Sequence, residues 1–186
     1  TEHTADMRAC AEWIRAQLAS AGLTAEVVDT GGHPAVLADT GPVAAGAPTL
    51  LFYGHYDVQP VGDVSLWDSP PFEPEIREQA IYARGSADDK GQVMTHLAAV
   101  RAWHAAGGDW PVRIKFLIEG EEEIGSPHLP ALVERLRERL ACDYVVLSDT
   151  SKLDAKTPAM TYATRGLVYK EVFVEGPKRD LHSGQY

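Results

Sequence analysis

The hydrophobic positions of the chain gather into three strongly apolar runs. They are "PTLLFYG" (48–54), "VRIKFLIEG" (112–120) and "DYVVLSD" (143–149). Continuous apolar runs of this length are typical of strands that are covered on both faces of a sheet. Two shorter β-type runs, at 23–29 and 35–39, precede them. We therefore predict a sheet with the three strongly apolar runs as buried strands at its centre.

Segments with helical periodicity separate these runs. Apolar residues recur at three- and four-residue spacing between Asp6, the expected N-cap, and Gly22, the expected stop. Similar patterns predict helices over 89–108 and 127–140, and the stretch 75–85 predicts a short hairpin. The order of these elements predicts an α/β fold, with a mixed, mostly parallel sheet flanked by helices on both faces.

Polar side chains follow the ends of the predicted strands. They are His55, Asp57, Asp88, Asp89, Glu121, Glu122, Glu123 and Asp149. In open α/β sheets ligands bind beyond the carboxyl ends of the strands, so we expect these side chains to share one rim. Two carboxylates about 4 Å apart repel by roughly 4 kcal/mol at an effective dielectric near 20, so a clustered set calls for a polyvalent cation. Imidazole and carboxylate ligands without thiolate favour zinc, with manganese or cobalt as alternatives.

The hydrophobic pattern changes from about Tyr162. The segment "GLVYKEVFVEG" alternates apolar and polar residues, which predicts a strand covered on one side and the start of a different sheet. We place a domain boundary near Arg165, with residues 1–164 in the first domain and residues 165–186 in the second. The second domain is then represented by its first strand alone.

The amino-acid composition argues against some classes of partner and indicates the cellular compartment. The 186 residues carry 17 basic and 27 acidic side chains, a net charge of −10, which argues against nucleic acid and an anionic membrane surface as partners. No run approaches the roughly 18 apolar residues that a membrane-spanning helix requires. Cys10 and Cys142 form neither a disulfide framework nor a metal knuckle, so we expect a reducing, cytoplasmic compartment.

Five motifs carry a family resemblance: "GHYDVQP", "YARGSADDKG", "EGEEEIGS", "LSDT" and "RDLHSG". In this order and spacing the sequence resembles the M-twenty metallopeptidase family, which includes carnosine dipeptidases, aminoacylases and glutamate carboxypeptidase. The similarity is greatest to the carnosine-type dipeptidases, through the first and last motifs. The resemblance implies that residues 1–164 are a zinc-dependent catalytic domain, incomplete at its C-terminal end. It also implies that residues 165–186 begin an α+β lid and dimerisation domain.

The same resemblance implies two zinc ions per site, with manganese or cobalt as substitutes. By motif position the ligands are His55, Asp88 as the bridge between the ions, Glu123 and Asp149. One ion then has three protein ligands, while the ion at Glu123 has two and lacks the usual third. The family supplies this fifth ligand with a histidine farther toward the C-terminus, outside this sequence. A cis peptide between Asp88 and Asp89 is also implied.

Catalytic roles follow from the motifs as well. Glu122 is expected as the general base, Asp57 as the carboxylate that orients the His55 ring, and His182 as a lid residue that reaches the partner subunit's active site. Glu121 is expected to face away, as a solvated or supporting group. The remaining histidines are expected to be solvated or packed: His3, His33, His96, His104 and His128.

The reaction implied by the resemblance is hydrolysis of a peptide or amide bond in dipeptides or short peptides by a homodimer, through a metal-bridged water. One alternative is a deacylase or desuccinylase of N-acyl amino acids with the same dinuclear site. A remote alternative is a non-catalytic binding protein on the same fold, against which the presence of Glu122 and the motif ligands counts. Because one ligand lies elsewhere, we expect the 186-residue chain alone to be inactive and to bind at most one zinc ion tightly.

Overall fold

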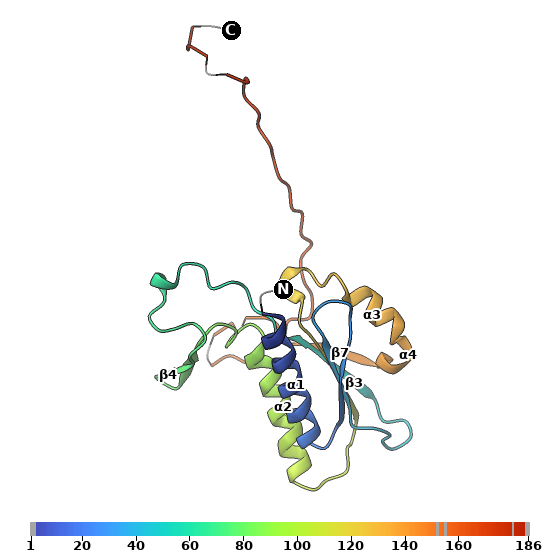
Figure 1. The fold of residues 1–186 in the computed structure, drawn as a ribbon. Helices are drawn as coiled ribbons and strands as arrows, with labels where there is room; N and C mark the ends of the chain where they lie inside the picture. The colour runs from blue at the N-terminus through green and yellow to red at the C-terminus, as the bar shows by residue number, and fades with distance from the viewer. Residues whose placement is uncertain (1–2, 152, 155, 180, 185–186) are drawn as a thin grey trace. The chain divides into compact units, whose positions relative to one another are not determined.

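The structure, a computed structural model, describes residues 3–151, 153–154, 156–179 and 181–184. The chain divides into two units between Thr150 and Ser151. Every helix and strand that the described residues form belongs to the first unit (Figure 1). The residues predicted to bind metal therefore lie in the first unit, and His182 lies in the second.

A five-stranded mixed sheet forms the centre of the first unit. Its strands follow the order β1-β2-β6-β3-β7. Their bounds are β1 (Thr24–Val28), β2 (Ala35–Asp39), β3 (Thr49–His55), β6 (Arg113–Glu119) and β7 (Tyr144–Leu147). β3, β6 and β7 run parallel, while β2 is antiparallel to both of its neighbours. The predicted mixed sheet with parallel central strands is confirmed.

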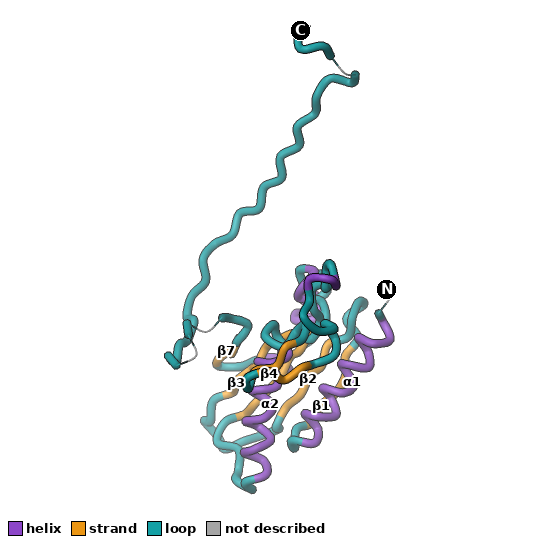
Figure 2. The backbone as a smooth tube through the Cα atoms, turned by 90° about the vertical axis from the view of Figure 1, so that its left-hand side faces the viewer, coloured by secondary structure: helices purple, strands orange, loops and turns teal. Residues whose placement is uncertain are grey.

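Helices cover both faces of this sheet. α1 (Thr4–Ser20) and α2 (Lys90–Ala105) lie on one face, and α3 (Leu129–Arg135) and α4 (Arg137–Leu140) lie on the other (Figure 1). Figure 2 shows α1 and α2 running alongside the strands. Phe116 and Leu117, neighbours on β6, enter the two different cores, which explains why this strand is apolar without alternation. Among the described residues, no helix combines the length and the apolar character needed to cross a bilayer.

A separate two-stranded hairpin lies between β3 and α2 in the sequence. β4 (Glu75–Arg77) pairs with β5 (Ala80–Tyr82), apart from the main sheet (Figure 1). Glu78 and Gln79 turn the chain with positive φ values of 48° and 67°. The predicted hairpin over 75–85 is confirmed.

The helices differ from the predictions at their boundaries. α1 begins at Thr4 with His3 at the N-cap, so Asp6 is not the cap but lies in the first turn, where its charge still suits the positive helix end. The helix predicted over 127–140 is interrupted at Leu136, which adopts φ −108°. Backbone hydrogen bonds continue on both sides of Leu136, so the interruption is a local distortion of one helical segment.

The prediction that 143–149 is a strand buried on both faces is wrong. β7 pairs only with β3 and lies at the edge of the described sheet. Tyr144, Val145 and Leu147 are 64%, 52% and 57% exposed. Among the described residues, β7 has no second neighbouring strand. An apolar run shows that a strand can be buried, but it does not show which residues bury it.

The second unit contains no helix or strand among its described residues. Residues 161–177 are exposed and lack the strand that their alternating pattern predicts. A strand forms where a neighbouring strand exchanges backbone hydrogen bonds with it, and the described residues of this unit provide no such neighbour. The boundary near Arg165 and the assignment of 165–186 to a lid domain stay predictions.

Candidate metal centre

The carboxyl ends of the parallel strands bring the predicted metal ligands together. His55 is the last residue of β3, and Asp149 follows β7. Glu122 and Glu123 lie three and four residues beyond the end of β6, in a short 3-10 turn, η2 (Glu122–Ile124). Asp88 lies just before α2. The structure therefore places these side chains at one rim of the sheet, as the strand order leads us to expect.

The His55 imidazole stands at the centre of this cluster. Its side chain is fully buried, and Nε2 lies 3.0 Å from Asp88 Oδ1, 3.6 Å from Asp149 Oδ2 and 3.9 Å from Glu122 Oε2. Two sets of side chains could each hold a metal ion, because the potential ligand atoms within each set all lie within 4.8 Å of one another. One set is His55, Asp88 and Glu123, and the other is His55, Glu122 and Asp149. Each set is small enough for a single cation to contact all of its members.

The electrostatics of the cluster favour a bound cation. Burial and neighbouring carboxylates raise the pKa of Glu122 and of Asp149, even though His55 opposes the effect. Burial raises the pKa of Asp89 to about 6; its Oδ2 accepts the His55 N–H at 3.2 Å, and its buried Oδ1 has no partner among the described residues. A cation would offset this excess of negative charge, and the imidazole and carboxylate donors suit zinc, manganese or cobalt. The implied cis peptide between Asp88 and Asp89 is present.

Asp57 connects the His55 ring to the turn after β6. Its Oδ1 lies 3.2 Å from His55 Nδ1, and its two oxygens accept the N–H groups of Glu122 at 3.2 Å and Glu123 at 2.9 Å. Burial opposes a charge on His55, but the hydrogen bond and charge of Asp57, with neighbouring acids, raise the pKa of His55 to about 9. The contact expected between Asp57 and His55 is therefore present, and Asp57 also fixes the backbone that carries both glutamates.

Gln59 holds the Glu123 carboxylate. Its Nε2 donates to Glu123 Oε2 at 2.9 Å and to Glu123 O at 3.0 Å, and its backbone N–H donates to Oε1 at 3.3 Å. Gln59 is not among the site residues predicted from the sequence. Its place in "GHYDVQP", within five residues of His55, is the signal that could have identified it.

Two glutamates beside the cluster have protein partners of their own. Glu119 is 4% exposed and accepts hydrogen bonds from Tyr53 Oη and, at 2.8 Å, from Ser126 Oγ. Glu121 is 5% exposed, and its Oε2 lies 2.7 Å from His128 Nδ1. The solvated alternative for Glu121 is therefore wrong, because the loop before β2 and the start of α3 cover it.

His96, in the first unit, and His182, in the second, each have contacts within their own unit. His96 packs against Phe52, with ring centroids 4.5 Å apart, and its Nε2 lies 2.7 Å from Ser148 Oγ. His182, in the second unit, accepts the Gly184 N–H at Nδ1 over 3.2 Å. The role of His182 at a partner's active site stays a prediction.

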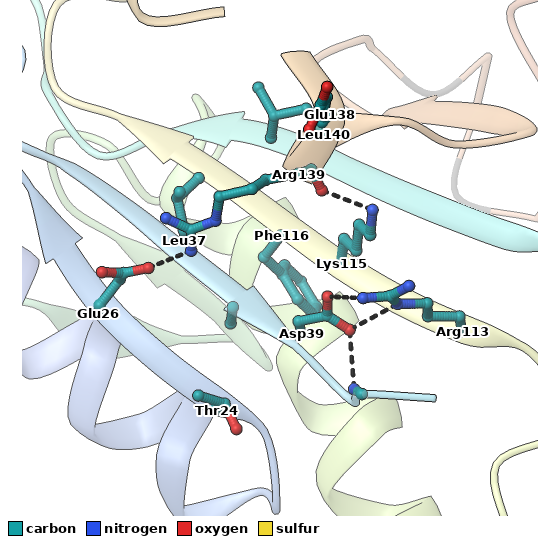
Figure 3. Close-up of a pocket in the computed structure, with 12 residues that line it drawn as sticks. Thr24, Glu26, Leu37, Asp39, Arg113, Lys115, Phe116, Glu138, Arg139 and Leu140 are labelled. Carbon is teal, nitrogen blue, oxygen red and sulfur yellow. Dashed lines mark hydrogen bonds and ion pairs between the residues drawn. The ribbon is translucent and has the colours of Figure 1, made fainter. Parts of the chain in front are cut away.

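A cavity of about 320 Å³ lies at the opposite end of the sheet, beside the start of β6 (Figure 3). Arg113 donates to both carboxylate oxygens of Asp39, at 3.0 and 2.6 Å, and Arg139 pairs with Glu26. Lys115, only 5% exposed, donates to two backbone carbonyls at the end of α4. These basic groups have partners within the protein, so the cavity lacks the unbalanced charge of the His55 cluster.

The sequence of this chain is similar to those of known peptidases. The sequence matches the peptidase family M20/M25/M40 over residues 51–167. It is 41% identical to the Beta-Ala-His dipeptidase of Homo sapiens over 155 residues, which are 82% of this chain and 30% of that protein. It is 38% identical to a Cys-Gly metallodipeptidase of Schizosaccharomyces pombe over 141 residues, which are 74% of this chain and 30% of that protein. The chain thus spans about 30% of the length of these relatives.

The fold of this chain is also similar to solved structures of peptidases. An M20 family metallo-carboxypeptidase from Sulfolobus solfataricus is 37% identical with a TM-score of 0.72, over 81% of this chain and 34% of that one. The dipeptidase Dug1p from Saccharomyces cerevisiae is 33% identical with a TM-score of 0.73, over 82% of this chain and 35% of that one. Both comparison proteins are peptidases by name.

Proposed function

Because the chain belongs to the peptidase family M20/M25/M40, we propose that it supplies the metal-binding residues of an enzyme that hydrolyses the amide bond of dipeptides or short peptides. The observation that carries this proposal is the meeting of the His55 imidazole with two carboxylate sets, each within 4.8 Å, at the carboxyl ends of parallel strands. The dipeptidase relatives support dipeptides as the substrate class. Free amino acids would be the products.

Two zinc ions per site, with manganese or cobalt as substitutes, are part of the proposal. His55, Asp88 and Asp149 would hold one ion, because His55 Nε2 lies 3.0 Å from Asp88 Oδ1 and 3.6 Å from Asp149 Oδ2. Asp88 and Glu123, which belong to one candidate ligand set, would hold the other ion with a histidine from elsewhere in a longer protein. When bound, the metals would supply Lewis-acid activation of the scissile carbonyl and of a water molecule. Three carboxylates around buried His55 provide the negative charge that such ions need.

Glu122 moves the proton in the proposed reaction. Its Oε2 lies 3.9 Å from His55 Nε2, beside the expected ligand atoms, and burial with neighbouring acids raises its pKa, which makes it a better base than a free glutamate. It accepts a proton from the attacking water and then donates it to the leaving amine. Glu123 is kept for metal binding, because Gln59 fixes its carboxylate separately.

The proposal extends to the assembly and the compartment. His182, within "RDLHSG", would reach the active site of a partner subunit in a homodimer and contact the substrate carbonyl. Cys10 and Cys142 are both free thiols, which supports a cytoplasmic location.

A substrate panel on the full-length enzyme, with zinc or manganese added, tests the reaction class. We expect kcat/KM for dipeptides to exceed that for N-acetyl and N-succinyl amino acids by at least about tenfold, because the pocket discriminates by contacts outside the reacting amide. The reverse preference would identify a deacylase or desuccinylase. Bound metal without turnover of either class would identify a non-catalytic binding protein.

A further inference from the structure

Glu121 is a buried carboxylate that the proposed reaction does not use. Both of its oxygen atoms are engaged: Oε1 accepts the His33 N–H at 3.1 Å, and Oε2 lies 2.7 Å from His128 Nδ1. A carboxylate is costly to bury without partners, so Glu121 keeps its position only while these contacts exist. Glu121 also directly precedes η2, the turn that carries Glu122 and Glu123.

Three segments that are distant in the sequence meet at Glu121. His33 belongs to the loop between β1 and β2 and lies 88 residues before Glu121. His128 is the N-cap residue of α3. Because β2 is paired within the sheet and α3 packs on the opposite face from α1, the carboxylate is anchored to two separate parts of the fold.

The loop between β1 and β2 approaches Glu121 so closely that a side chain at residue 32 would displace Glu121 or His128. A Cβ atom at Gly32 would lie 2.1 Å from Glu121 Oε1 and 2.6 Å from His128 Nδ1. Both distances are far below an ordinary van der Waals contact of about 3.5 Å. Glu121 Oε1 cannot move away without losing the His33 N–H, so a methyl group at this position would break the contact.

The turn that follows has few other degrees of freedom. The Glu121 carbonyl accepts the N–H groups of Ile124 at 3.2 Å and Ser126 at 2.8 Å. The two N–H groups next to Glu121 donate to the Asp57 carboxylate. The side chain of Glu121 adds contacts to His33 and His128, which are the links from this turn to the loop before β2 and to α3.

We propose that Glu121, Gly32, His33 and His128, here named the Glu121 latch, position the base and the metal-binding glutamate that follow Glu121. This inference rests on the proposed function, because it assigns a positioning role within the same site. No member of the latch belongs to the candidate metal-ligand sets or is the proposed base. The latch acts through the backbone: it fixes the Cα atom of Glu121 and hence the paths of the next two side chains.

Removal and restoration of the His128 contact test the latch in the full-length enzyme. We expect His128→Ala to lower kcat about tenfold and to weaken zinc binding about tenfold, with KM within about twofold, since supporting contacts of metal ligands have effects of this size. His128→Asn keeps an N–H donor near the position of Nδ1 and should recover most of both losses. Zinc affinity is measured by calorimetric titration.

Gly32→Ala tests the same contact from the opposite side. This variant leaves Glu121 and His128 unchanged, yet its methyl group should displace the carboxylate and reproduce the His128→Ala losses in kcat and zinc affinity. His3→Ala, at the N-cap of α1 with a side chain that is 78% exposed, is the matched control and should leave both values unchanged. The melting temperature of each variant is recorded, so that misfolded protein is recognised.

A purely structural role would give a different result. If folded His128→Ala and Gly32→Ala lowered the melting temperature but kept kcat and zinc affinity within twofold of the parent, the latch proposal would be wrong. An Asn variant as impaired as the Ala variant would also overturn it. If the parent enzyme hydrolysed no dipeptide, the proposed function would fail, while the zinc titrations would still decide whether the latch positions Glu123.

Discussion

The two ends of the central sheet both concentrate charge, but they balance it differently. At the start of β6, Asp39 faces Arg113 and Glu26 faces Arg139 (Figure 3). At the carboxyl ends of β3, β6 and β7, several carboxylates surround the single imidazole of His55. The first end is neutralised by its own side chains, and the second end is not.

The pKa directions express this contrast. Burial acts to raise the pKa of Asp39, but the hydrogen bonds and charge of Arg113 outweigh it and hold that pKa below its ordinary value. Burial and neighbouring acids raise the pKa of Asp149 and Glu122. A charged carboxylate in a cluster of like charges is stabilised by a basic partner, by hydrogen-bond donors, by a proton or by an external cation. Asp39 has its basic partner, whereas the acids around His55 carry an excess of negative charge that a bound metal would offset.

Among the variants at the His55 cluster, Glu122→Gln should give the largest loss of activity. We expect kcat of the full-length enzyme to fall about 1000-fold, since general base catalysis contributes roughly 100- to 10,000-fold, while zinc content stays unchanged. Steady-state kinetics and metal analysis of the same preparation measure both. Glu138→Gln, beside the neutralised cavity, should behave like the parent. Loss of zinc from the Glu122 variant would mean that Glu122 is a ligand, as one of the two ligand sets permits.

Asp57→Asn tests how strongly zinc binding at the His55 cluster depends on the carboxylate that contacts the His55 ring. We expect the zinc dissociation constant of the 186-residue chain to rise about 10- to 100-fold, because the amide cannot accept from the His55 ring and from both turn N–H groups equally well. Calorimetric titration measures the change. Asp39→Asn, its counterpart at the other end, should leave zinc affinity unaltered, and an equal loss in both variants would refute the contrast.

The pH dependence of the melting temperature of the metal-free chain tests the charge of His55. The folded pKa of His55, about 9, exceeds its ordinary value of 6.5, so protonation of His55 favours the folded state. This stabilisation is fully present below about pH 6.5 and is lost as the pH rises through about 9. We expect the melting temperature in the presence of a chelator to fall by several °C over this window, since a loss of about 1 kcal/mol already lowers it by roughly 2–4 °C in a domain of this size.

Circular dichroism at several pH values follows this transition. In Asp57→Asn, which removes the main partner that raises the pKa of His55, the slope should be smaller. A melting temperature that rises between pH 6.5 and 9 in the parent chain would contradict the assignment.

Arg113→Met should give the smallest effect. The Arg113–Asp39 pair is about one-third exposed on both sides, and pairs of this kind contribute roughly 0.2–1 kcal/mol. We expect urea unfolding to show a loss in this range, with no change in zinc affinity. A loss of zinc binding in this variant would show that the two ends of the sheet are coupled.

Local patterns in the sequence were sufficient for much of the fold and part of the site. The strands, the hairpin and the helices over 4–20 and 90–105 follow from residue periodicity and turn residues. The rim that gathers His55, Glu123 and Asp149 follows from the direction of parallel strands. Periodicity failed at β7, since an apolar run reports only that a strand can be covered on both faces.

The sequence by itself determined which chemical groups stand at the strand ends, because apolar runs locate the strands and the polar residues follow them directly. Only the tertiary structure decided how the neighbouring glutamates divide their contacts. Glu121 is turned toward His128, Glu123 toward Gln59, and Glu122 toward the His55 ring. The reason is physical: adjacent residues share one local pattern, whereas their partners come from segments as far as 88 residues away, and packing alone brings those segments together.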